Sequence, residues 1–127
     1  MSLKFPIVVL ERRIMNLRQE ISRKRDYLER LRRRRSWYTM YVMSLQWEAS
    51  RNRHLSETIR TGSAELKREL LEKSERYSRE YEKAYQELNE IERLMRKIEE
   101  DLNIELAELE RLTDELKRLY RMVGVRM

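Results

Sequence analysis

The fold is decided in residues 88–119, which read LNEIERLMRKIEEDLNIELAELERLTDELKRL. Apolar side chains recur there at alternating steps of three and four residues, and Glu105 is the one exception. A helix with this spacing places its apolar side chains on a single stripe, which is the pattern of a coiled coil. The stretch therefore predicts a long helix with one face buried against a partner helix.

The same spacing extends over residues 70–123 and occurs again over residues 10–59. The chain has 127 residues with only two glycines, one proline and no cysteine. This composition favours long helices and excludes a disulfide framework. The stripe is interrupted at six positions, namely Lys24, Arg35, Asn52, Ser56, Ser74 and Glu105.

The two striped segments are separated by Thr61-Gly62-Ser63. Gly62 can adopt the left-handed conformation that ends a helix, and Ser63 can cap the next helix. We predict helices over about residues 6–60 and 64–122, joined by this turn in one domain of residues 1–127. The predicted fold is all-α, a long antiparallel two-helix coiled-coil hairpin. The competing possibility is that the polar stretch Ser50–Ser56 breaks the first helix, which would give a bundle of shorter helices.

A hairpin that folds about Ser63 pairs residues whose numbers add to 126. Apolar residues then face each other along the seam, for example Leu10 with Leu116 and Leu28 with Ile98. Sliding the helices by one heptad moves the turn away from the glycine. The match of apolar with apolar residues along the seam, together with the position of the turn, therefore specifies the register.

The polar interruptions also match across the seam. Asn52 meets Ser74, and Lys24 and Glu105 fall in adjacent layers where they can pair. A buried polar residue that is matched to a polar partner fixes register, because a shift leaves it unmatched. We predict that these four residues set the register.

Few residues of this sequence are suited to catalysis or metal binding. His54 is the only histidine, which excludes a His-based metal cluster and leaves a single candidate base for a nucleophile–His–acid triad. The sequence contains no glycine-rich phosphate loop. We therefore predict a non-enzymatic protein with no catalytic, cofactor-binding or metal-binding residues and no small-molecule substrate.

The first helix carries a second apolar stripe within residues 32–47, RRRRSWYTMYVMSLQW. On the side opposite the seam lie Trp37, Met40, Met43 and Trp47, which we name the Trp–Met patch. A two-helix hairpin leaves this patch in water, and exposed Trp and Met together indicate an interface. We predict that two or more hairpins associate there into a four-helix or larger bundle.

The first helix is also strongly basic. Residues 1–60 hold 15 Lys and Arg against 6 Asp and Glu, a net charge of +9, whereas residues 61–127 hold 14 against 17, a net charge of −3. Arginines bind phosphate groups without sequence preference. The candidate polyanion contacts are the outward-facing Arg12, Arg23, Arg30, Arg33 and Arg51.

The leading interpretation is a structural or scaffold protein that self-assembles as a homo-oligomer through the outer face of its first helix. The alternative is a DNA- or RNA-binding or packaging protein, such as a nucleoid or virion component, that uses the arginines. An adaptor for a protein partner and a membrane-surface helix are further possibilities. No apolar stretch reaches the length of a membrane span, so we expect a cytoplasmic protein or a virion component. The 22 arginines against 7 lysines are compatible with a thermophilic source.

Overall fold

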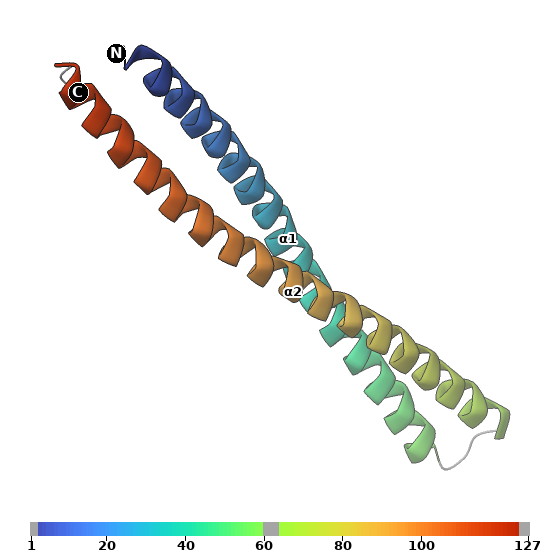
Figure 1. Ribbon diagram of the computed structural model, residues 1–127. Coiled ribbons are helices and arrows are strands. Elements are labelled where there is room, and N and C mark those ends of the chain that lie inside the picture. Colours follow the sequence, from blue (N-terminus) through green and yellow to red (C-terminus); the bar gives the residue numbers. More distant parts are fainter. Residues whose placement is uncertain (1–2, 60–63, 125–127) are drawn as a thin grey trace. The chain divides into compact units, whose positions relative to one another are not determined.

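The computed structural model, which describes residues 3–59 and 64–124, consists of two long α-helices (Figure 1). Helix α1 spans Lys4–Thr58 and helix α2 spans Ala64–Met122, and the two pack against each other as a helical hairpin. No strand occurs among the described residues. The prediction of an all-α hairpin is confirmed, and α2 has the predicted bounds. The predicted turn, Thr61-Gly62-Ser63, lies outside the described residues.

The helix ends follow local chemistry. Helix α1 begins two residues before the predicted start, because Pro6 lies in the first turn, where a missing N–H removes no intrahelical hydrogen bond. After α2, Gly124 adopts a positive φ of 77°, and its N–H donates to the carbonyl of Arg121 at 3.1 Å. This is the conformation that glycine supplies at helix C-termini. Val123, which we placed on the seam, follows the end of α2 and is exposed.

Helix α1 continues without interruption through the polar stretch Ser50–Ser56. Asn52 donates its side-chain amide to the carbonyl of Glu48 at 2.7 Å, and Ser56 donates its hydroxyl to the carbonyl of Arg53 at 2.7 Å. Side chains that bond back to their own helix satisfy their polar groups without ending it. The alternative of several shorter helices is therefore not realised in the described chain.

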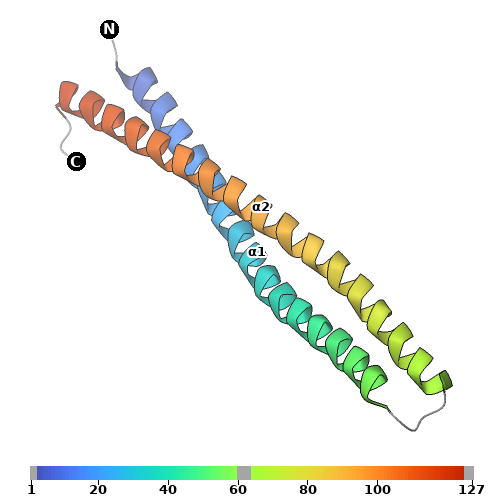
Figure 2. The same ribbon diagram turned by 90° about the horizontal axis from the view of Figure 1, so that it is seen from below.

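The packed helices divide into two units, each formed by one segment of α1 and one antiparallel segment of α2 (Figures 1 and 2). The first unit comprises Met1–Arg30 and Met95–Met127, and the second comprises Leu31–Leu94. In both units, every buried side chain among the described residues occupies a position of the predicted stripes. The stripe therefore identifies the core correctly.

The core of the first unit is built from leucine and isoleucine, with Met95 as the one buried methionine. A buried cluster of Leu10, Ile14, Leu112 and Leu116 joins α1 to α2, as the predicted register requires. Half-buried side chains surround it, namely Ile7, Leu17, Leu109, Leu119 and Tyr120. Burial of these branched side chains is the main stabilising contribution in this unit.

The core of the second unit combines small residues with aromatic ones. Val42, Leu45, Ala84 and Leu88 form its buried cluster. Seven of the ten aromatic residues of the chain lie in this unit. Four half-buried tyrosines pack against the cluster, namely Tyr38, Tyr41, Tyr77 and Tyr81. The small side chain of Ala84 leaves room for rings that two facing leucines would exclude.

Candidate interaction surface

The Trp–Met patch lies on the face of α1 that points away from the core of the second unit. Its side chains are 59 % (Trp37), 73 % (Met40), 64 % (Met43) and 60 % (Trp47) exposed. Every other large hydrophobic residue described in this unit is less than 45 % exposed. The four residues are therefore distinct from the scattered apolar side chains that all protein surfaces carry.

Both tryptophans are held by neighbours on their own helix. The Trp37 ring packs edge-on against Tyr38, with centroids 4.9 Å apart, and at a tilt against Tyr41 at 5.0 Å. The guanidinium of Arg51 lies 5.2 Å from the ring centroid of Trp47. Such aromatic and cation–π contacts restrict the rings before any partner binds. The contact of Trp37 with Tyr41 was not predicted, although their spacing of four residues is its sequence signal.

The five candidate polyanion contacts are all exposed. Arg12, Arg23 and Arg30 belong to the first unit, and Arg33 and Arg51 belong to the second. The guanidinium of Arg30 lies 5.7 Å from the ring centroid of Tyr27. Within residues 3–59 and 64–124, neither Arg12 nor Arg23 forms an ion pair. Acidic side chains of the described chain thus do not neutralise these two arginines.

Two of the predicted register residues are buried in the second unit. Ser74, which is 1 % exposed, donates its hydroxyl across the seam to the backbone carbonyl of Ala49 at 2.8 Å. Asn52, expected to meet Ser74, instead bonds to the Glu48 carbonyl of its own helix. A backbone acceptor is available at every residue and has no sequence signature. The sequence therefore identified the buried polar residues but not their partners.

The other two register residues form a hydrogen-bonded ion pair in the first unit. Lys24 Nζ donates to Glu105 Oε1 across the seam. The Glu105 side chain is only 15 % exposed, and its other oxygen is buried without a hydrogen-bond partner among the described residues. The pKa of Lys24 is raised above its ordinary value of 10.5, chiefly by this hydrogen bond.

We expect Lys24→Met to lower the free energy of unfolding by about 2 kcal/mol, because the Glu105 carboxylate then remains in the seam without its cation. The double variant Lys24→Met/Glu105→Leu should be at least as stable as the wild type, since apolar residues commonly replace a buried ion pair without loss. Urea denaturation followed by circular dichroism measures both. A Lys24→Met variant as stable as the wild type would show that the pair contributes nothing.

The thermal stability of the protein should also decrease at alkaline pH. The pKa of Tyr120 is raised above its ordinary 10.0 by the hydrogen bond that its hydroxyl donates to Glu11, as that of Lys24 is raised by Glu105. The folded chain holds both protons more tightly than the unfolded chain. The stability that these two groups contribute is therefore complete below their ordinary pKa values and is lost as the pH rises through their raised pKa values. We expect Tm to fall above about pH 10. The Tm of the triple variant Lys24→Met/Glu105→Leu/Tyr120→Phe should fall less steeply with pH than that of the wild type. An equal decrease of Tm in both proteins would contradict this assignment.

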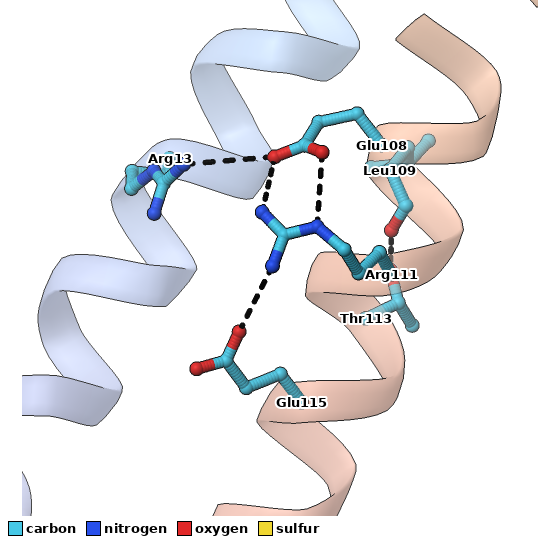
Figure 3. A network of polar contacts seen from close by, with 6 residues as sticks. All are labelled: Arg13, Glu108, Leu109, Arg111, Thr113 and Glu115. Carbon is cyan, nitrogen blue, oxygen red and sulfur yellow. Dashed lines mark hydrogen bonds and ion pairs between the residues drawn. The ribbon is translucent and has the colours of Figure 1, made fainter. Parts of the chain in front are cut away.

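A further polar network links the helices of the first unit (Figure 3). Arg111 donates from Nε and Nη2 to the two carboxylate oxygens of Glu108 at 3.0 and 2.6 Å. Arg13 of α1 lies 3.6 Å from Glu108 Oε1, and Arg111 Nη1 lies 3.7 Å from Glu115 Oε2. The hydrogen bond from Arg111 is the main cause of the lowered pKa of Glu108. These side chains are at least one-third exposed, so the network contributes little to stability.

Comparisons with protein-family models, with curated proteins and with solved structures find no match to this chain. Within the described ranges, no three or more His, Asp or Glu side chains gather as they would around a metal ion. Neither α1 nor α2, as described, combines the length and apolar character that crossing a membrane requires. The Trp–Met patch and the exposed arginines are therefore the surfaces from which function is argued.

Proposed function

We propose that this protein is a non-enzymatic structural protein that self-assembles through the Trp–Met patch. The observation that carries the proposal is the exposure of four large apolar side chains on one face of α1, each at least 59 % exposed. Association removes this surface from water, which is the dominant favourable contribution to most protein–protein binding. The four side chains lie outside the core cluster of the second unit, so the patch is available to a partner.

The size and composition of the patch support this proposal. Tryptophan and methionine side chains present about 200 Å² each, so the patch exposes roughly 500 Å² per copy. Two copies that cover each other would bury about 1,000 Å², which reaches the lower limit for a specific interface. Apolar residues hold the centre, and Arg33 and Arg51 lie at its margins, as in the core and rim of known interfaces.

Light scattering coupled to size-exclusion chromatography tests the proposal directly. The chain has a mass of 15.8 kDa, and we expect at least twice this mass at micromolar concentrations. Dilution should shift the population toward the monomer, because an interface of this size is moderate in strength. A mass of 15.8 kDa at every concentration would contradict self-assembly.

Binding to a polyanion is the second candidate function, and the observation that favours it is the pair Arg12 and Arg23. Both are exposed and unpaired among the described residues, and the full sequence has a net charge of +6. Arginine contacts to phosphates release counterions, so the affinity for nucleic acid must fall as salt rises.

Titration of DNA and RNA duplexes at several salt concentrations tests this second function. If the protein binds nucleic acid through these arginines, the double variant Arg12→Gln/Arg23→Gln should bind all sequences more weakly. The slope of log affinity against log salt concentration should also become shallower by about 2. The control is Arg79→Gln with Arg96→Gln on α2, which should leave the slope unchanged. Binding that is absent at low salt, or that does not change with salt, would contradict it.

A further inference from the structure

The exposed residues around the Trp–Met patch are arranged nearly symmetrically about Val42. At 100° per residue, positions equally far before and after Val42 lie at mirrored angles on the helix surface. Two pairs of these positions on the outer face hold identical residues. They are Trp37 and Trp47 at five residues and Arg33 and Arg51 at nine, whereas Met40 is mirrored by Ser44 at two.

This symmetry permits an antiparallel contact between two copies of α1 in which like meets like. With the midpoint at Val42, Trp37 of each copy faces Trp47 of the other, and Met40 of each copy faces Ser44 of the other. The tryptophans of both copies then coincide. Any other antiparallel register places a tryptophan against charged or polar side chains, because the outer face is polar on both sides of residues 37–47.

Electrostatics selects the antiparallel contact over the parallel one. A parallel contact sets the four arginines of residues 32–35 beside the same four of the second copy. The antiparallel contact sets them beside residues 49–52, which contain one arginine, and moves the two runs about 25 Å apart along the helix. That separation exceeds the screening length of about 8 Å at physiological salt. In the antiparallel contact only Arg33 and Arg51 of the two runs face each other as like charges, so the two copies repel less than in the parallel contact.

We infer that the partner of the Trp–Met patch is the same patch of a second copy, packed antiparallel around a twofold axis that passes the outer face of α1 at the level of Val42. This inference rests on the proposed self-assembly and specifies its geometry. A twofold contact uses the same surface on both copies and leaves none for a third, so assembly through this patch stops at a dimer of hairpins.

Cysteine crosslinking tests the geometry, because the natural chain contains no cysteine. We would prepare Arg33→Cys and Arg51→Cys, with an affinity tag on one of them, and oxidise each alone and as a mixture. The antiparallel contact brings position 33 of one copy to position 51 of the other. Equal positions lie 18 residues, or about 27 Å, apart along the helix, beyond the reach of a disulfide. The matched control is Gln86→Cys on the outer face of α2.

We expect a disulfide-linked dimer in the mixture and no linked dimer in either single variant or in the control. Links within each single variant would show a parallel contact and overturn the inference, while self-assembly through this face would stand. Equal linking at all positions, or a light-scattering mass well above twice 15.8 kDa, would also overturn it. A monomer without links would contradict the proposed function as well.

Discussion

Replacing Leu112 with alanine is expected to lower the free energy of unfolding by about 3 kcal/mol. Leu112 is 2 % exposed and packs in the cluster with Leu10, Ile14 and Leu116. Truncation removes buried methyl groups and leaves a cavity that two long helices cannot close without shifting their other layers. Urea denaturation at fixed protein concentration, followed by circular dichroism, measures the loss.

The control for this prediction is Ile104→Ala on the same helix. Ile104 is 69 % exposed, so its truncation should change the free energy of unfolding by less than about 0.5 kcal/mol. The two variants differ in burial and are otherwise closely matched in chemistry. Equal losses would mean that the seam does not separate buried from exposed positions as the structure describes.

The double variant Trp37→Ala/Trp47→Ala is expected to dissociate the assembly while leaving the helices intact. Truncation of a tryptophan at an interface centre commonly costs about 2 kcal/mol of binding. A dimer of this variant loses four tryptophans, two from each copy, so the dissociation constant should rise by at least roughly a thousandfold. The helices should persist, because both side chains are more than half exposed and lie outside the core clusters.

Light scattering and circular dichroism on the same sample separate the two effects. The control is Leu71→Ala on α2, a 44 % exposed apolar residue of the same unit outside the Trp–Met patch, which should leave the mass unchanged. A decrease in helicity together with a decrease in the light-scattering mass would show that the tryptophans belong to the core. An unchanged light-scattering mass would show that the Trp–Met patch is not the interface.

Much of the fold follows from the spacing of apolar residues. That spacing predicted both helices, their antiparallel packing and the positions of all buried side chains in the described chain. It succeeds because a continuous two-helix seam translates sequence period directly into burial. The ends of α1 were less well placed, since Lys4 and Thr58 depend on local hydrogen bonds that the stripe does not encode.

The polar details of the seam were only partly predictable. Lys24 and Glu105 pair as their opposite charges suggest. Ser74 was identified as buried, but its acceptor is the Ala49 carbonyl, and nothing in a side-chain pattern distinguishes one backbone carbonyl from the next. The exposure of the Trp–Met patch follows from its place opposite the stripe. The packing of Trp37 on Tyr41 depends on rotamers that sequence alone leaves open.

The polar contacts across the seam have a mechanical consequence. In the first unit Lys24 bonds to Glu105, and in the second Ser74 bonds to the backbone of Ala49. When α1 and α2 are pulled along their axes in opposite directions, apolar side chains can re-engage after one heptad, about 10 Å further on. Each polar contact must break before any sliding begins. Both units therefore resist shear at small displacements.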